Sequence, residues 1–282
     1  MQKIAHRKAL RKIDNQEQFA ASDIDGVWNI SIREYVPLVC LALHDGSSFP
    51  STLEQECLLT PLERRFEEDP HTAKLVDASP IVVSGLDSRY YYDLNRKPAG
   101  CTENTVFGRE VWKQGVHPSP KLARERHRRF YTLLDRLLGK LVELYGSCLI
   151  MDIHSYNYSR IPRGTPLFNL GTTYVDQNRY RAVVAYLSKE LTKIRIAGET
   201  TCVAENDVFL GAGYFAHWAS NQHPDCLTLP LDIKKIYCDE KTGEPRQFTM
   251  EYLAGGLDSA IQRTARFYNR AFVSPTEGSQ VG

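Results

Sequence analysis

Short apolar runs alternate along the chain with longer stretches in which apolar residues recur every three or four positions. The short runs are nearly continuous in apolar residues, which is typical of strands buried on both faces. They predict strands at 36–43, 80–84, 147–153, 200–204 and 226–232. Alternation of such strands with helices predicts an α/β fold with a mainly parallel or mixed central sheet flanked by helices.

The longer stretches predict three main helices. The clearest covers 120–145, where the apolar residues fall at helical spacing and Gly146 supplies a stop. A second helix is expected from Asp176, a suitable N-cap, to about residue 194. A third is expected over roughly 248–268. These elements indicate a single α/β domain.

The expected domain covers 31–273. Residues 1–30 are expected to form an N-terminal extension with some helix, and the small polar residues of 274–282 a flexible tail. Hydrophobic residues make up 42% of the chain and charged residues 24%, which excludes a disordered protein. A formal net charge of +1 supplies no overall field that would attract nucleic acid or an acidic membrane.

The N-terminal segment and the cysteines indicate in which cellular compartment the protein is expected. The basic start of the chain has no apolar core behind it and does not resemble a secretory signal, and the longest apolar run, 35–43, is too short to span a bilayer. The seven cysteines include no CxxC pair, and Cys40, Cys148 and Cys202 lie inside apolar runs. Reduced, buried thiols in a cytoplasmic protein are therefore expected.

Two histidines follow predicted strands. His44 ends the first strand and His154 the third, and ligands bind at the carboxyl edge of such sheets. Two histidines and a carboxylate leave one open position on zinc, the pattern of catalytic sites. Asp152 shares a strand face with His154 and is placed to accept a ring N–H of a ligand histidine. Spacing alone leaves turn or surface histidines as the alternative; His127, on a basic helix, is expected to be solvated.

A second group of polar residues follows the second strand. In the segment SRYYYDLNR, Arg89 and Arg96 bracket three tyrosines, and Asn95 precedes Arg96. Arginine forks and an amide can hold a carboxylate, although the spacing by itself favours surface ion pairs with Asp87 or Asp93. Asp232 ends the last strand, where it can serve as a general base, a helix N-cap or the partner of Lys234 or Lys235.

Five blocks occur in the order found in the N-formylglutamate amidohydrolase family, which the chain resembles over roughly 36–242. They are LHDGSSFP, SRYYYDLNR, DIHS, the segment from Asn206 through GAGYFAHW, and LDIKKIYCDE. The family is related to zinc carboxypeptidases and aspartoacylases. The resemblance therefore implies a zinc-carboxypeptidase-like, phosphorylase/hydrolase-like fold and one zinc ion bound by two histidines and a carboxylate.

The resemblance also implies roles for individual residues. His44 and His154 take the histidine positions, and Asp69 is the choice for the third ligand, with Glu68 and Glu56 as alternates. Asn95 and Arg96 would hold the substrate's α-carboxylate with help from Arg89, and Tyr214 belongs to the family's Gly-Gly-Tyr turn and would line the substrate site. Arg89 and Asp232 are expected to be catalytic.

Two departures from the family pattern affect these roles. Asp232 stands where the family usually has Glu, which shortens the reach of the base by about 1.5 Å. The first block reads LHDG instead of Pro-His-Ala-Gly, which keeps the ligand but adds the acid Asp45 beside it.

The expected function is therefore zinc-dependent hydrolysis of the amide bond of an N-acyl amino acid or short peptide-like substrate that carries a carboxylate. A metallopeptidase or cell-wall amidase is the alternative within the enzymes, since Tyr90, Tyr91 and Tyr92 could line a wider, apolar pocket. A non-catalytic metal- or ligand-binding homologue is the alternative of another class. No nucleic-acid or membrane partner is expected, and the oligomeric state stays open.

Overall fold

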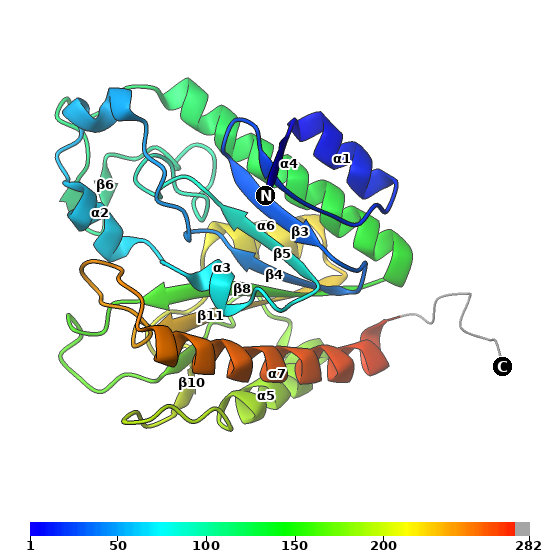
Figure 1. The fold of residues 1–282 in the computed structure, drawn as a ribbon. Helices are drawn as coiled ribbons and strands as arrows, with labels where there is room; N and C mark the ends of the chain where they lie inside the picture. Colours follow the sequence, from blue (N-terminus) through cyan, green and yellow to red (C-terminus); the bar gives the residue numbers. More distant parts are fainter. Residues whose placement is uncertain (274–282) are drawn as a thin grey trace.

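A nine-stranded sheet forms the centre of the computed structural model, which describes residues 1–273 (Figure 1). The strand order is β1-β2-β3-β5-β4-β8-β11-β9-β10. Its strands are β1 (Gln2–Ile4), β2 (Phe19–Asp23), β3 (Trp28–Ile32), β4 (Leu38–Ala42), β5 (Ile81–Gly85), β8 (Cys148–Tyr156), β9 (Phe168–Leu170), β10 (Val203–Glu205) and β11 (Cys226–Lys234). A separate hairpin consists of β6 (Thr105–Val106) and β7 (Arg109–Glu110). The predicted tail, 274–282, lies outside the described residues.

The sheet is mixed. Its central strands β5, β4, β8 and β11 are mutually parallel, whereas β3 and β9 run antiparallel to β5 and β11. All five predicted strands are present, and the predicted α/β class with a mixed sheet flanked by helices is confirmed. Strands β1, β2, β3 and β9 were not predicted, because they are short and carry polar residues.

Helices cover both faces of the sheet. They are α1 (His6–Asp14), α2 (Pro61–Glu67), α3 (Thr72–Leu75), α4 (Pro120–Tyr145), α5 (Gln177–Leu191), α6 (Tyr214–Gln222) and α7 (Gln247–Phe272), with a 3-10 turn at Ser51–Glu56. Figure 1 shows α1 and α4 on one side of the sheet and α5 and α7 on the other. Successive residues of a strand point to opposite faces of the sheet. In β4, Val39 and Leu41 belong to the core under α4, whereas Leu38 and Cys40 belong to the core under α7.

Helix α4 has the predicted bounds and ends at Gly146, which adopts a left-handed conformation with φ 72°. The predicted N-cap Asp176 accepts hydrogen bonds from the first turn of α5. The prediction that His127 is solvated was wrong. His127 lies on the face of α4 that packs inward, its Nε2 is 2.9 Å from the Arg96 carbonyl, and it stacks on Tyr131.

The first thirty residues form β1, α1, β2 and the start of β3, so they continue the central sheet at one edge. All seven cysteines are free thiols, and six are buried. The expectation of burial was wrong for Cys202, because β10 begins only at Val203 and forms the other sheet edge. Within residues 1–273, every helix is too short or too polar to cross a membrane.

Candidate active site

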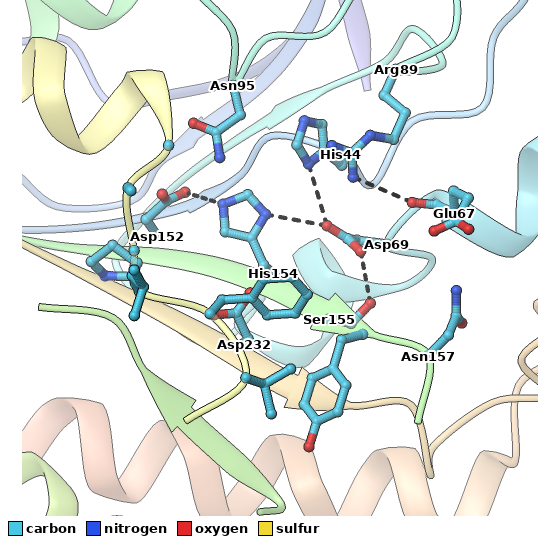
Figure 2. Close-up of a pocket in the computed structure, with 18 of the residues that line it drawn as sticks. His44, Glu67, Asp69, Arg89, Asn95, Asp152, His154, Ser155, Asn157 and Asp232 are labelled. Carbon is cyan, nitrogen blue, oxygen red and sulfur yellow. Dashed lines mark hydrogen bonds and ion pairs between the residues drawn. The ribbon is translucent and has the colours of Figure 1, made fainter. Parts of the chain in front are cut away.

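A cavity of about 420 Å³ opens at the carboxyl ends of the central strands (Figure 2). His44 lies two residues beyond β4, and His154 and Asp232 lie near the ends of β8 and β11. Strands β8 and β11 run two to three residues past the predicted ends, and their pairing places Asp232 opposite His154. Parallel strands thus deliver these side chains to one edge of the sheet, as expected for this type of fold.

His44, Asp69 and His154 converge on the floor of the cavity, and all three are buried. Oδ2 of Asp69 lies 3.4 Å from Nδ1 of His44 and 3.2 Å from Nδ1 of His154. One potential ligand atom from each residue lies within 4.8 Å of the others. The structure therefore brings together the three residues that the sequence analysis assigned to a metal.

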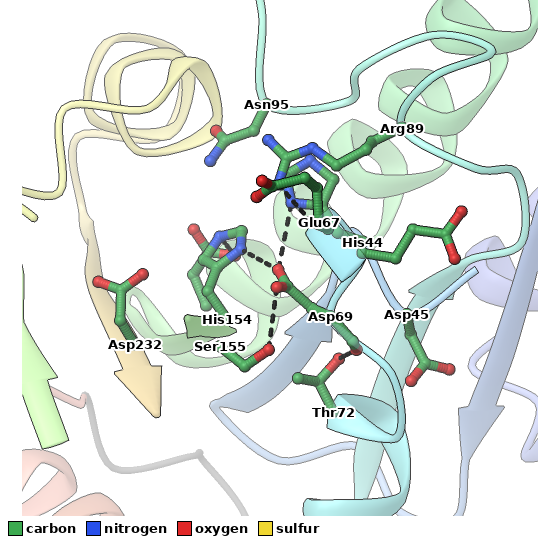
Figure 3. Close-up of polar contacts among 12 residues, drawn as sticks. His44, Asp45, Glu67, Asp69, Thr72, Arg89, Asn95, His154, Ser155 and Asp232 are labelled. Atoms are coloured by element: carbon green, nitrogen blue, oxygen red, sulfur yellow. Dashed lines mark hydrogen bonds and ion pairs between the residues drawn. The ribbon is translucent and has the colours of Figure 1, made fainter. Parts of the chain in front are cut away.

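Each histidine has a second carboxylate on the side of its ring that faces away from Asp69. Nε2 of His44 is 2.7 Å from Oδ1 of Asp93, and Nε2 of His154 is 3.1 Å from Oδ1 of Asp152. The hydroxyl of Ser155 donates a hydrogen bond of 2.9 Å to Oδ1 of Asp69 (Figure 3). Carboxylates behind ligand histidines fix the ring orientation and make the free nitrogen a better metal ligand.

The donor set fits a zinc-like cation. Nδ1 of His44 is buried without a hydrogen-bond partner in the described chain, although it faces Asp69. Tetrahedral zinc with bonds of about 2.0–2.1 Å separates its ligand atoms by roughly 3.3 Å, close to the spacings between Asp69 and the two histidines. Two imidazoles and one carboxylate would leave a fourth position open towards the cavity.

Two acids of the floor are held in their charged forms. Burial alone would raise the pKa of Asp69, but its hydrogen bond with His154 and the charges of His44 and His154 hold it far below its ordinary value. Burial would lower the pKa of His154, but Asp152 and Asp69 raise it well above its usual range. The pKa of Asp93 is held well below its ordinary value, because Arg89 and His44 outweigh burial. Asp69 and Asp93 therefore remain charged, and Asp69 supplies a negative charge beside both histidines.

Asp69 reaches the floor from the loop between α2 and α3. Helix α2 is fixed by a capping box between Thr60 and Glu63, and the Asp69 N–H donates to the His44 carbonyl at 2.9 Å. The buried ammonium of Lys235 donates to the carbonyls of Phe66 and Glu68 at 2.8 and 2.7 Å. These contacts hold the loop against the sheet.

The alternates for the third ligand lie elsewhere. The Glu68 carboxylate faces Arg65 at 3.3 Å, and Glu56 belongs to the 3-10 turn. Among the described residues, the potential metal-binding group consists of His44, Asp69 and His154.

Asp232 lines the cavity beside His154. It is 8% exposed, and its Oδ2 accepts a hydrogen bond of 3.2 Å from the Asn169 side chain. Burial raises the pKa of Asp232 to about 7, although His154 and Asn169 oppose the shift. A carboxyl group with such a pKa can both accept and return a proton near neutral pH.

Arg89 and Asn95 line the cavity opposite Asp232. Oδ1 of Asn95 accepts the Phe215 N–H at 3.0 Å, which leaves its amide nitrogen to face the cavity (Figure 2). Arg89 pairs with Asp93 at 2.9 Å, and its Nε is buried without a partner within the described chain. The Asn95 amide therefore presents a donor to the cavity, and Arg89 adds a positive charge to its wall, a combination that suits a substrate carboxylate.

Arg96 and Tyr214 lie outside this cavity. They border a separate hollow beyond Asn95, together with His217, and Arg96 pairs with Glu103. The expectation that tyrosines widen the pocket was wrong, because Tyr90, Tyr91 and Tyr92 are at most 3% exposed and pack in the core.

The sequence analysis missed several residues of the site. Asp93 was considered only as a surface partner of arginine, although it lies in the SRYYYDLNR block. Ser155 follows His154 directly, and strand alternation gave no reason to expect contact with Asp69. Lys235 was considered only as a partner of Asp232. Their roles depend on contacts between segments far apart in sequence.

Comparison with known proteins concerns both the family and the fold. The family model described as N-formylglutamate amidohydrolase matches residues 36–237. A crystallised N-formylglutamate amidohydrolase from Ralstonia eutropha JMP134 is similar, with a TM-score of 0.71 and 21% identity over 87% of this chain and 99% of that chain. The gene product Atu2144 from Agrobacterium tumefaciens has a TM-score of 0.59 and 16% identity over 86% of this chain and 95% of its own.

At these identities the structural similarity bears on the fold alone. No functionally curated protein matched the sequence. The family model covers more than half of the chain, within the region where the five blocks occur in order. The chain therefore belongs to the N-formylglutamate amidohydrolase family.

Proposed function

We propose that this chain is a zinc-dependent hydrolase that cleaves the amide bond of an N-acyl amino acid or a short peptide-like substrate. Membership of an amidohydrolase family supports a hydrolase of amide bonds. The observation that carries the metal dependence is the convergence of His44, Asp69 and His154, with a carboxylate behind each histidine. When bound, zinc supplies a Lewis acid that polarises a carbonyl group and makes water more acidic.

The protein residues divide the remaining work. Asp232 accepts a proton from the attacking water and returns it to the leaving amine, a role supported by its pKa of about 7 and its place in the cavity. Arg89 and Asn95 hold the substrate's carboxylate. Asp93 and Asp152 orient the two histidines.

Orientation of the substrate follows from the separation of these groups. The carboxylate anchors come from the segment after β5, and Asp232 comes from β11, which lies three strands away in the sheet. A substrate that spans the cavity would place its scissile amide over the floor between them. Holding the reacting groups in this geometry lowers the entropic part of the barrier.

The test combines metal analysis with turnover. Purified protein is analysed for zinc by mass spectrometry and assayed with N-formyl and N-acyl amino acids. His154→Ala is expected to lose both bound zinc and turnover, whereas His217→Ala, at the separate hollow, is expected to retain both. Full activity in a metal-free preparation would contradict the proposal.

A further inference from the structure

The mouth of the cavity carries apolar side chains, although the floor is polar. Phe107, Phe209 and Leu210 line it and are 44%, 37% and 58% exposed. We call these three residues the apolar rim. Large apolar side chains gathered at the opening of a cavity are typical of a surface that binds an apolar group of a ligand.

Phe107 occupies a backbone position that disfavours it. Strands β6 and β7 are joined by the two-residue loop Phe107–Gly108, and both residues have positive φ, 49° and 76°. Such a loop favours Asn-Gly, because asparagine adopts the left-handed conformation more readily than an aromatic residue does. A strained residue beside a cavity is a reason to look for a function.

The ring of Phe107 also has defined neighbours. The guanidinium groups of Arg89 and Arg160 lie 4.8 and 5.4 Å from its centroid. Arg160 pairs in turn with the Glu67 carboxylate at the cavity wall. Two cations thereby contact the ring, and the side chain, still 44% exposed, lines the cavity.

The other side of the rim is anchored to the sheet. The Asn169 amide donates to the Phe209 carbonyl at 2.8 Å, and its side-chain oxygen accepts the N–H groups of Asp207 and Val208. The same amide contacts Asp232 at 3.2 Å. Phe209 and Leu210 are thus set at a fixed place relative to Asp232.

The charges in the cavity argue against a second substrate carboxylate. Arg89, beside Asp93, is the cation proposed to hold the first carboxylate. The other cations that line the cavity have protein partners within the described part of the chain: Arg160 has Glu67, and Lys235 has two carbonyls. Glu67, Asp152 and Asp232 also line it. A dicarboxylic substrate would place its side-chain charge near these acids without a cation of its own.

We infer that the apolar rim selects an N-acyl amino acid with a single carboxylate and a large apolar group, and that it discriminates against an N-formyl dicarboxylic amino acid. This inference rests on the proposed function. Arg89 and Asn95 hold the one carboxylate, and Phe107, Phe209 and Leu210 cover the apolar group. The apolar group belongs either to the acyl part or to the amino-acid side chain.

The test uses zinc-loaded protein and three substrates: N-formylphenylalanine, N-phenylacetylglycine and N-formylglutamate. Phe107→Asn creates the favoured Asn-Gly turn, so the variant is expected to unfold at the same or a higher temperature. It is expected to lower kcat/KM for the preferred apolar substrate at least tenfold more than it lowers kcat/KM for N-formylglutamate, because loss of the ring beside Arg89 acts on every substrate and loss of the apolar contact acts on one. Phe248→Asn makes the same substitution at an exposed site on α7, 78% exposed, and serves as the matched control.

Binding is measured separately with N-methanesulfonyl analogues of phenylalanine and glutamate, which resist hydrolysis. The inference is supported if the phenylalanine analogue binds more tightly than the glutamate analogue and if Phe107→Asn weakens that binding tenfold. This holds even when no amide bond is cleaved, an outcome that contradicts only the proposed function. The inference is overturned if the glutamate compounds are preferred in both assays, or if Phe107→Asn weakens binding and turnover of all compounds equally. The proposed function still stands in that case, provided that an amide bond is cleaved. Preference for N-formylphenylalanine or for N-phenylacetylglycine shows whether the apolar group belongs to the amino-acid side chain or to the acyl part of the substrate.

Discussion

The floor and the apolar rim of the cavity differ in how the chain builds them. The polar floor, consisting of His44, Asp69, His154, Asp93 and Asp152, is buried at the ends of central strands and in adjoining loops, and its members contact one another. The rim, in contrast, lies on a short hairpin and on the loop before α6, and its side chains are partly exposed.

This difference separates two tasks. A metal site needs donors held within a few tenths of an ångström, and mutual contacts among buried charged groups provide that precision. An apolar group is recognised by area and shape, which loops at an opening can provide and vary without disturbing the floor. Substitutions in the floor should therefore affect metal binding and every substrate, whereas those in the rim should affect some substrates only.

The largest effect is expected at the centre of the floor. Asp69→Asn removes the carboxylate that faces both histidines, so zinc content should fall to background and turnover should drop by roughly a thousandfold or more. Zinc should raise the melting temperature of the native protein and leave that of the variant unchanged. Glu68→Gln, at the neighbouring acid that faces Arg65, is the control and should keep its zinc.

The two carboxylates behind the histidines should differ. Asp93 lies 2.7 Å from Nε2 of His44 in a hydrogen bond, whereas Asp152 is 3.1 Å from Nε2 of His154 without hydrogen-bond alignment. Asp93→Asn should therefore weaken zinc binding about 10- to 100-fold, and Asp152→Asn should weaken it less. Competition with a chelator of known affinity measures both. A larger loss in Asp152→Asn would show that contact geometry does not rank these residues.

Asn95 and Arg89, which are proposed to hold the substrate's carboxylate, belong to neither the floor nor the apolar rim. A Cβ atom at Gly213 would lie 2.4 Å from the Asn95 amide, so Gly213→Ala should displace that side chain and raise KM about tenfold through a lost hydrogen bond to a charged group. Zinc content should not change. Gly139→Ala, on α4 with open space around it, is the control and should leave KM unaltered. An unchanged KM in Gly213→Ala would show that Asn95 does not bind the substrate's carboxylate.

The smallest effect is expected at the most exposed residue of the rim. Leu210→Ser should lower kcat/KM for apolar substrates by about threefold, because part of one side chain leaves the contact surface. The free energy of unfolding should change by less than about 0.5 kcal/mol. Denaturant titration and metal analysis check the second part. Loss of zinc in this variant would show that rim and floor are coupled.

The regular elements of the domain core follow from the sequence. Apolar periodicity located the central strands β5, β4, β8 and β11 and the edge strand β10. It also gave the bounds of α4. Both results follow because a buried element must be apolar on every face that packs. Apolar periodicity failed for β1, β2, β3 and β9. Their pairing depends on neighbours that are distant in sequence, and a short run with polar residues carries little periodic signal.

For the site, the sequence determined which residue types occur and on which strand ends they lie. His44, His154 and Asp232 were found in this way, because parallel strands carry their ends to one edge. The family resemblance favoured Asp69 over Glu68 and Glu56, but only the tertiary structure shows which acid faces the two histidines, since Asp69 lies on a loop held by Lys235 and the His44 carbonyl. It likewise separated Asn95, which enters the cavity, from its neighbour Arg96, which lies outside it. Side-chain direction at the end of a loop depends on packing against other segments, and no local pattern of residues encodes that packing.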